Sequence, residues 1–453
     1  MFKIPKEVIL LMEIFKKNHY QIYLVGGAVR DFLLGKTPTN FDFATNASPE
    51  EIQKLFPQSF YNNLYGTVSI PGDIKTADGV KKTVFEITPF RKEANYQDFR
   101  HPKKIEWAKT VLEDLARRDF TINALAYDGK NIIDPYLGQQ DLKNKLIKTV
   151  GDPDKRFNED ALRLLRAVRL ACELGFFIEE KTQKSIKKNA VLIKKISWER
   201  IREEFFKILA ANHSAEGILF LRNTGLLAHI LPELDLCFNI PQKSPKRHHI
   251  YDVGTHLVLS LKNCQSEDII TRFATLIHDI GKAPTFRKDE KTGIITFYNH
   301  EVVGTKLAEN IADRFKLSNK QKDKLVKLVK YHQFSVSEKQ TDKAIRRFIR
   351  HVGKEYLDDI IALRFADRLG SGAKADSWRF KLFRKRLIEV QKEPFKIADL
   401  KINGFDVMNI LEIKPGPEVG SVLDTIFNEV VEGKLKNERS ILINRLKQIK
   451  QKK

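Results

Sequence analysis

Two short apolar segments near the amino terminus carry side chains that could hold metal ions. Asn40 and Asp42 alternate with phenylalanines in Asn40-Phe41-Asp42-Phe43, and Glu86 lies between apolar residues in a second segment. If the first segment is a β-strand, alternate residues point to one face, so Asn40 and Asp42 share that face. Carboxylates on adjacent strands can hold Mg²⁺ against a triphosphate and an attacking hydroxyl, as two-metal phosphoryl transfer requires. The pattern predicts such a site, whereas each residue alone is typical of a solvated strand.

A glycine pair, Gly26-Gly27, precedes these segments. It follows the apolar run at residues 22–25 and comes before a helical pattern over Ala28–Leu34. A strand, two glycines and a helix start can bring backbone N–H groups close to an anion, and Arg30 adds positive charge. The pair alone is typical of a simple turn, so its interpretation depends on the residues downstream.

A second group of potential metal ligands lies far along the chain. It combines imidazoles and carboxylates on segments with helical periodicity: His256, the doublet His278-Asp279, His300, His332 and Asp367. Such side chains from several helices can converge on one or two divalent metals and activate water for phosphoester hydrolysis. A single histidine of this kind is more often a hydrogen-bonded core residue, so the prediction depends on the whole set.

The elements that must position these residues divide the chain into regions. A mixed α/β region comes first, with one helix over Pro49–Phe56 capped by Ser48. Its strand segments are Phe41–Ala44, Thr67–Ile70 and Thr83–Thr88. From Asn158 the pattern is almost wholly helical, which predicts a multidomain α/β plus all-α protein. The expected domains are a head at 1–150, a neck and body at 151–245, a helical domain at 246–372 and a helical tail at 373–453. A linker is predicted from the cluster of Pro232, Pro241 and Pro245 with Lys243, Lys246 and Arg247.

The composition limits the class of protein. The chain has 453 residues and a net charge of +22, from 80 Lys and Arg against 58 Asp and Glu. This excess predicts nucleic acid or an anionic membrane surface as a partner, with lysine-rich composition as the neutral alternative. Three cysteines, none in a Cys-x-x-Cys pair, exclude a disulfide framework and a zinc ribbon, and they favour a cytoplasmic setting. The first 20 residues are too charged and too short to span a membrane, and an amphipathic helix is expected there.

The spacing from the glycine pair to the first strand resembles that of the nucleotidyltransferase superfamily that includes DNA polymerase β. A longer set of segments is similar to the bacterial-type (class II) CCA-adding tRNA nucleotidyltransferases and their poly(A) polymerase relatives. These segments are Gly26–Gly35 with Asp42–Thr45, Asp114–Ala124, Glu159–Arg169 and Ser197–Glu204. The resemblance implies a polymerase-β-like head, a helical neck and body, Mg²⁺ in the head, and tRNA, CTP and ATP as substrates.

By this resemblance, Asp160 and Arg163 select the incoming nucleotide. A carboxylate beside a guanidinium matches the amino donor and ring-nitrogen acceptor of cytosine and adenine, and it mismatches uracil and guanine. We expect one helix over Glu159–Glu173 with these residues on its polar face; a merely solvated face is the alternative. The other nucleotide-binding residues that the resemblance implies are Gly26, Gly27, Arg30, Arg117, Arg118, Asp119, Asn123, Arg166 and Arg169.

One position departs from the resembled family. Its first metal carboxylate corresponds to Asn40, whose amide oxygen is uncharged and holds Mg²⁺ less firmly than a carboxylate. Either Asp42 and Glu86 suffice in this chain, or nucleotide transfer is weakened. An active enzyme is the preferred interpretation because the other segments are intact. A catalytically weakened RNA-binding protein is the alternative.

The second group also has a family likeness. The doublet His278-Asp279 followed by Gly281-Lys282, together with the flanking ligands, resembles the HD phosphohydrolase superfamily. The resemblance implies a phosphodiesterase or phosphatase that acts on 2′,3′-cyclic or terminal phosphates, and hence a part in RNA repair. Mixed imidazole and carboxylate ligation favours Ni, Mn, Zn or Co over Mg²⁺. A helical spacer that keeps its ligands without turnover is the alternative.

Two details favour full CCA addition over its variants. Residues 88–93 lack the Gly-Arg-Arg-Phe-type segment of bacterial poly(A) polymerases, and the loop before Arg117 has the length that CC-adding enzymes lack. A poly(A) polymerase, or an A-adding or CC-adding enzyme, is the second interpretation. Phosphates of tRNA are then expected on Lys181, Lys184, Lys187, Lys188, Lys194, Lys195, Arg200 and the carboxyl-terminal lysines.

Overall fold

The computed structural model describes residues 4–62, 66–76, 79–96, 102–242, 251–374, 377–391 and 397–451. The chain forms two compact units: unit 1 is Met1–Asp235 with Arg314–Lys316, and unit 2 is Leu236–Asp313 with Leu317–Lys453. Several predictions concern residues outside the described ones: the linker residues Lys243, Pro245, Lys246 and Arg247, residues 97–101 of the loop before Arg117, and Lys452 and Lys453.

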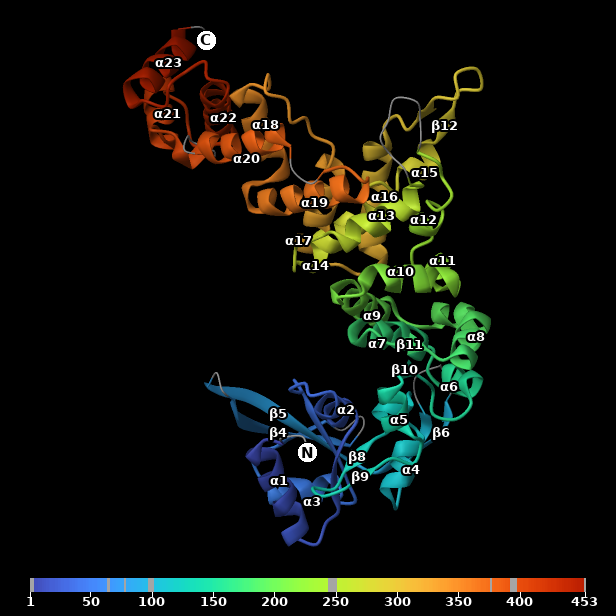
Figure 1. Cartoon of the computed structure of the whole chain (residues 1–453). Coiled ribbons are helices and arrows are strands. Elements are labelled where there is room, and N and C mark those ends of the chain that lie inside the picture. The colour runs from blue at the N-terminus through green and yellow to red at the C-terminus, as the bar shows by residue number, and fades with distance from the viewer. Residues whose placement is uncertain are drawn as a thin grey trace. The chain divides into compact units, whose positions relative to one another are not determined.

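Unit 1 contains the predicted α/β head, built on a mixed sheet (Figure 1). In the described part of the chain, its strand order is β3-β4-β5-β2-β1-β8-β9. The bounds are β1 Ile22–Val25, β2 Phe41–Thr45, β3 Phe60–Asn62, β4 Thr67–Thr76, β5 Gly79–Pro89, β8 Ala126–Tyr127 and β9 Ile132–Ile133. Strands β2 and β5 run parallel, and the other neighbours pair antiparallel. A separate hairpin joins β6 (Arg91–Tyr96) to β7 (Pro102–Trp107).

Alternation along β2 and β5 decides which side chains are buried. Phe41 and Phe43 are buried and meet the ring of Phe85 edge-on, with ring centroids 6.0 Å apart in each pair. Asp42 lies between them and points to the opposite face, where it is directly beside Glu86 in the parallel register. Burial of each phenylalanine contributes about 1.5–3 kcal/mol. A one-residue slip of β2 would turn Phe41 and Phe43 outward, so the core fixes the register that pairs the two carboxylates.

Short helices pack on the head sheet. Helix α1 (Lys6–Lys17) is the predicted amphipathic helix and buries Val8, Leu11, Met12 and Phe15. Helix α3 (Pro49–Leu55) begins as predicted at Ser48, which forms a capping box with Glu51. The remaining elements are α2 (Gly27–Leu33), α4 (Val111–Ala116), η1 (Thr121–Asn123) and α5 (Gly138–Lys143).

The neck follows as a run of helices in the same unit. Helices α6 (Pro153–Glu159) and α7 (Arg163–Leu174) replace the single helix expected over Glu159–Glu173, so that expectation was wrong at its start. Asp160 has an extended backbone and its Oδ1 accepts from Leu162 N–H at 3.1 Å, which ends α6. The run continues through α8 (Glu180–Asn189), η2 (Ala190–Lys195), α9 (Trp198–Ala210), α10 (Ser214–Asn223), α11 (Leu226–Ile230) and α12 (Pro232–Asp235), and β10 (Leu146–Ile147) pairs with β11 (Phe177–Ile178).

Unit 2 is mainly helical. Its first part contains α13 (Val253–Lys262), α14 (Ile269–Ile277), α15 (Lys282–Thr285), the small strands β12 (Arg287–Lys288) and β13 (Ile295–Thr296), α16 (His300–Arg314), α17 (Asn319–Tyr331), α18 (Asp342–Val352), η3 (Lys354–Tyr356) and α19 (Leu357–Gly370). Helices α13 and α19 approach closely, because a Cβ on Gly370 would lie only 2.2 Å from Ser260 Oγ. This approach brings the ends of both helices, and the ligand candidates on them, together.

The carboxyl-terminal part of unit 2 has its own small core. Leu400, Val407, Ile426 and Leu442 are among its buried residues. The elements are α20 (Trp378–Val390), η4 (Ile397–Asp399), α21 (Gly404–Leu411), α22 (Pro417–Val431) and α23 (Arg439–Gln451). Across the described ranges of the whole chain, none of the helices has the length and apolar character needed to cross a membrane.

Candidate nucleotidyl-transfer site and metal centre

A cavity of ≈ 430 Å³ in unit 1 brings most of the predicted head residues together. Strands β2 and β5, the α4–η1 segment, the α6–α7 junction and α9 all contribute side chains. The predicted residues on its wall are Gly26, Gly27, Asp42, Glu86, Arg117, Arg118, Asp119, Asn123, Asp160, Arg163 and Arg166. Sequence reasoning did not single out Thr67, Thr88 and Arg91, which also line it. Their residue types are common on strands, and only the fold places them here.

The two carboxylates lie at one end of this cavity. Burial raises the pKa of Asp42, and the Arg118 guanidinium offsets this only in part. Burial and then the charge of Asp42 raise the pKa of Glu86. Asp42 is half-buried and Glu86 is exposed, and two neighbouring carboxylates that repel each other are stabilised by a cation between them. Oxygen donors of this kind fit a divalent metal such as Mg²⁺.

Gly26 leaves space for the Arg118 guanidinium, one of the positive charges of the cavity. Its φ is +72°, and an added Cβ would lie 2.8 Å from Arg118 Nη1, so glycine allows the guanidinium to pass over the backbone. Asp114, 1% exposed, accepts from Arg117 Nε at 2.9 Å and from Arg118 Nη2 at 3.2 Å. Burial raises the pKa of Asp114, but Arg117 and Arg118 together lower it by more than burial raises it, so the carboxylate stays charged. The arginines are thereby held at the cavity wall, available to an anionic ligand.

A second ion pair holds the far wall. Asp119 Oδ2 accepts from Arg166 Nε at 2.8 Å and from Arg166 Nη2 at 2.5 Å. Its other oxygen accepts from the Phe120 N–H at 2.8 Å and from Asn123 Nδ2 at 3.3 Å. Burial opposes ionisation of Asp119, but Arg166 and Arg163 outweigh it and hold its pKa well below the ordinary value. Arg30 extends this network because its Nη1 donates to Asn123 Oδ1 at 2.9 Å.

The predicted base-selecting residues Asp160 and Arg163 line the same cavity, and each has an ion-pair partner. Asp160 Oδ2 accepts from Arg200 Nη2 at 3.2 Å. Arg163 donates from Nη1 to Glu159 Oε2 at 2.8 Å. Arg200 was expected on tRNA phosphates, whereas here it lines the nucleotide cavity. The carboxylate and the guanidinium are therefore each positioned by an ion pair.

Three predicted residues of the head lie outside this cavity: Arg30, whose hydrogen bond to Asn123 is described above, Arg169 and Asn40. Arg169 donates from Nε to Glu204 Oε2 at 2.7 Å and from Nη1 to Glu173 Oε2 at 3.0 Å, so it joins α7 to α9. Asn40 lines a separate cavity that also contains Glu86. Asn40 immediately precedes β2 and is not among the residues that line the cavity with Asp42, although the two are only two residues apart.

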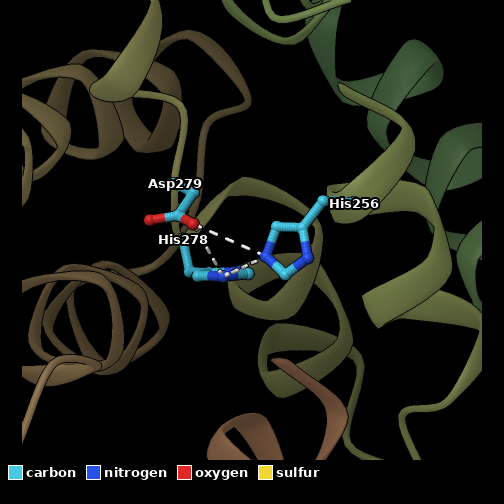
Figure 2. Close-up of side chains that lie close together, drawn as sticks. All are labelled: His256, His278 and Asp279. Atoms are coloured by element: carbon cyan, nitrogen blue, oxygen red, sulfur yellow. Dashed lines mark hydrogen bonds and ion pairs between the residues drawn. The ribbon is translucent and has the colours of Figure 1, made fainter. Parts of the chain in front are cut away.

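The second group of ligand candidates converges in unit 2. His256 Nε2 lies 3.5 Å from Asp279 Oδ2 and 3.3 Å from Asp367 Oδ1. His278 Nε2 lies 3.4 Å from Asp279 Oδ2 and 3.3 Å from His256 Nε2. Figure 2 shows His256, His278 and Asp279 with these atoms turned toward one another. On the other side of the same carboxylate, Asp279 Oδ1 lies 3.3 Å from Nε2 of both His300 and His332. The two oxygens of Asp279 therefore face two different sets of ligands.

The hydrogen bonds of the imidazoles suit metal binding. Nδ1 of His278, His300 and His332 lies 2.8, 2.8 and 2.6 Å from the backbone carbonyl three residues earlier. A carbonyl oxygen can only accept a hydrogen bond, so each Nδ1 carries the proton and donates it. Each Nε2 then presents a lone pair to the centre. His300 Nε2, His332 Nε2 and Asp279 Oδ1 are buried and make no hydrogen bond within the described residues. Such atoms are costly unless a ligand satisfies them, so the set fits divalent metal.

Charged side chains beside this centre were not predicted as part of it. Lys282 is buried, its Nζ lies 2.6 Å from Asp279 Oδ2, and it donates to Gln242 Oε1 at 2.7 Å. Arg364 Nη1 donates to Asp367 Oδ2 at 3.0 Å. Lys282 belongs to the motif quoted above but was given no role, because lysine and arginine in a helical pattern usually indicate a solvated face.

Comparisons with known proteins agree with this arrangement. Three family models match: the poly A polymerase head domain over residues 22–148, the probable RNA and SrmB-binding site of polymerase A over 175–237, and a putative tRNA nucleotidyltransferase domain 2 over 285–446. A CCA-adding enzyme of Ligilactobacillus salivarius is 32% identical over 446 residues, which cover 98% of this chain and 96% of the relative. The chain belongs to the family of CCA-adding tRNA nucleotidyltransferases and poly(A) polymerases.

Other members of the CCA-adding family support the assignment. An A-adding tRNA nucleotidyltransferase of Deinococcus radiodurans is 31% identical and matches 88% of this chain and 89% of that protein. A crystal structure of the Bacillus stearothermophilus CCA-adding enzyme in complex with CTP is 27% identical with a TM-score of 0.72, covering 99% of this chain and 98% of that one. These findings confirm the predicted family, the α/β plus all-α fold and a nucleotidyltransferase enzyme. None of the three family models is a model of HD phosphohydrolases.

Proposed function

We propose that this protein adds C, C and A to the 3′ ends of tRNA, using CTP and ATP. The observation that carries the proposal is one cavity whose wall joins the carboxylates Asp42 and Glu86 to the pair Asp160 and Arg163. Relatives with matching length include CCA-adding enzymes. A tRNA substrate, the cysteines and the absence of any described membrane-crossing helix make the cytoplasm the proposed location.

Each group of residues has a distinct part in the proposed reaction. Arg117, Arg118 and Arg166, held by buried aspartates, are placed to bind the anionic triphosphate. Asp160 and Arg163 would accept from the amino group and donate to the ring nitrogen of cytosine or adenine. Asp42 and Glu86 would hold Mg²⁺, which when bound supplies charge stabilisation for phosphoryl transfer.

A nucleotide-incorporation assay tests this function. The purified protein is incubated with tRNA lacking its 3′ CCA and with labelled CTP, ATP, UTP or GTP. We expect sequential addition of C, C and A. The Asp160→Ala variant should lose discrimination against UTP by about 1–3 kcal/mol per lost base contact, or roughly 10–100-fold. Glu199→Ala, an exposed neighbour in α9 outside the cavity, is the matched control. Full discrimination by Asp160→Ala would contradict the assignment of this residue.

The same assay separates the alternatives. Addition of A only to tRNA that already ends in CC would indicate an A-adding enzyme, the activity named for the Deinococcus relative. Growth of a poly(A) tail would indicate a poly(A) polymerase. Binding of tRNA without incorporation, restored by Asn40→Asp, would indicate that the amide at this position has removed the activity.

We further propose that unit 2 carries a metal-dependent phosphohydrolase centre for RNA 3′ ends. The observation that favours it is the division of the ligands by Asp279. Its Oδ2 faces His256 and His278, which also contact Asp367, and its Oδ1 faces His300 and His332. Imidazole ligands favour Ni, Mn, Zn or Co over Mg²⁺. A bound metal would supply an activated water, and 2′,3′-cyclic or terminal phosphates are the proposed substrates.

Metal analysis tests this centre directly. Elemental analysis after dialysis should find two metals per chain in the wild type and about one in His332→Ala. His229→Ala, a half-buried histidine of unit 1, should keep both. Hydrolysis of a 2′,3′-cyclic nucleotide should fall with the metal content. A wild type without metal, or a content that His332→Ala leaves unchanged, would contradict the proposal.

The positive charge of the neck is proposed to hold tRNA. The six lysines of α8 and η2 are exposed. Lys184 pairs with Glu180 and Lys188 with Asp154, whereas Lys187 makes no ion pair with the described residues. Lys187→Ala should therefore weaken tRNA affinity while the KM for CTP is unchanged. The loss should be larger at low salt, because phosphate contacts release counterions.

A further inference from the structure

Glu86 lines two cavities of the head. The second cavity, of ≈ 360 Å³, is lined by Thr39, Asn40, Lys82, Thr83, Val84 and Glu86. Glu86 is the one residue that it shares with the nucleotide cavity, which contains Asp42. Glu86 is opposite Asp42 in the β2–β5 register, whereas Lys82, Thr83 and Val84 precede the part of β5 that pairs with β2.

The chemistry of the proposed reaction assigns different ligands to the two cavities. In an in-line displacement, the attacking hydroxyl approaches the phosphorus from the side opposite the leaving pyrophosphate. Arg117, Arg118 and Arg166, the groups suited to a triphosphate, all line the nucleotide cavity. Besides the Glu86 carboxylate, which is proposed to hold metal, the second cavity has one cation, two hydroxyl groups and one amide on its wall. This smaller charge suits a ligand with one phosphodiester and a sugar, which is the composition of an RNA end.

Lys82 is free to meet such a ligand. It is exposed and makes no hydrogen bond or ion pair with another described residue, although Asp73 lies opposite it on β4. Its neighbour Lys81 is also exposed but points to the other face of β5, away from the cavity. The chain thus provides a natural pair of lysines of which one lines the cavity.

Asn40 adds a feature that a carboxylate would not. An amide both donates and accepts hydrogen bonds, whereas an ionised carboxylate only accepts them. A ribose 2′-hydroxyl is likewise both donor and acceptor, and it distinguishes RNA from DNA. A neutral side chain at this position leaves Glu86, the proposed metal ligand, as the one carboxylate among the residues that line the cavity.

We propose that this cavity receives the 3′-terminal nucleotide of the acceptor RNA, with Lys82 on its backbone phosphate and Asn40 on its ribose 2′-hydroxyl. The proposal rests on the nucleotidyl-transfer function proposed above. It makes Asn40 a contact to the acceptor end in addition to any part that it has in holding metal.

Acceptor binding by paired lysine variants tests the phosphate contact. Wild type, Lys82→Ala and Lys81→Ala are titrated with a minihelix that carries a single-stranded tRNA 3′ end, without nucleotide, over a series of salt concentrations. Lys82→Ala should bind about 5–10-fold more weakly, with a salt slope reduced by about 0.7 for one lost single-strand phosphate contact. Lys81→Ala should match the wild type. Equal affinities for the two variants would overturn the proposal.

Kinetics and a change of sugar provide two further readouts. Lys82→Ala should raise the KM for the minihelix and leave the KM for CTP unchanged; an effect confined to CTP would overturn the proposal. Wild type should bind a minihelix ending in a 2′-deoxynucleotide about 5–10-fold more weakly than the ribonucleotide form. Asn40→Ala should reduce this ratio to about one, and an unchanged ratio would refute the role of Asn40.

These binding measurements do not depend on catalysis. If the wild type incorporates no nucleotide, the proposed enzymatic function fails while the lysine comparison still decides what the cavity holds. If incorporation is normal and the lysine variants are alike, the cavity assignment fails alone.

Discussion

The ion pair between Asp119 and Arg166 allows a quantitative prediction. Asp119→Asn keeps the shape of the side chain but removes its charge, and its NH₂ group must then face either the Arg166 guanidinium or the Phe120 N–H, both donors. Breaking a buried ion pair costs about 3–5 kcal/mol. Because 35% of the Arg166 side chain is exposed and can be rehydrated, we expect a smaller loss of unfolding free energy, about 2–3 kcal/mol.

The pH dependence of this loss has a definite sign. The pKa of Asp119 is held well below its ordinary value of 3.8 in the folded protein. A carboxyl group whose pKa is lowered by folding contributes stability above the unfolded-state pKa, and this contribution disappears as the pH falls below it. The difference between wild type and Asp119→Asn should therefore be constant from about pH 5 to 8 and should shrink below about pH 4.

Urea unfolding followed by hydrogen exchange of unit 1 peptides measures this difference, because the two units need not unfold together. Asp152→Asn is the control: Asp152 caps α6 through the Lys155 N–H, and asparagine caps equally well. For a domain of this size, the expected loss lowers the Tm by about 4–12 °C. A loss under about 0.5 kcal/mol, or one that changes between pH 5 and 8, would refute the reasoning.

Three further predictions follow from close contacts and ion pairs. Gly281→Ala would place a Cβ 2.0 Å from the His300 carbonyl oxygen, so elemental analysis should show loss of at least one metal per chain; Gly420→Ala, with open space around it, should keep both. Gly138→Ala would place a Cβ 2.2 Å from the Thr121 carbonyl oxygen and should lower the free energy of unfolding by about 1–3 kcal/mol, measured by urea titration. Arg200→Ala removes the ion-pair partner of Asp160 and should raise UTP incorporation relative to CTP by roughly 10-fold. This corresponds to a loss of about 1.4 kcal/mol in discrimination. Unchanged selectivity would show that the ion pair only supports the fold.

Local chemistry made parts of the head predictable. The Ser48 cap with Glu51 gave the start of α3, because capping depends on residues three positions apart. Strand β4 was predicted to end at Ile70 but continues to Thr76. Pro71 and Gly72 usually break strands, yet short β3 ends its pairing at Ser69, so β4 has a free edge where proline is tolerated. At Gly72 the ring of Phe85 occupies the space of a side chain.

Long-range contacts account for what the sequence did not reveal. Asp160 pairs with Arg200, forty residues away, and helical periodicity carries no information about such a partner. The six ligand candidates of unit 2 could be predicted, because metal chemistry restricts the choice to a few histidines and aspartates. The structure brings all six together. Lys282 could not be assigned in the same way, because burial alone distinguishes it from a surface lysine.

The parallel register of β2 and β5 has a consequence for how the protein acquires its activity. Asp42 is opposite Glu86 only when Phe41 is opposite Phe85, so the aromatic core and the two carboxylates are aligned by the same pairing. A chain that paired these strands one residue out of step would bury a carboxylate and expose phenylalanines, and it would be both unstable and without a site. Misfolded copies would therefore be inactive on tRNA and would not add wrong nucleotides. In this head, correct folding is itself a safeguard of fidelity.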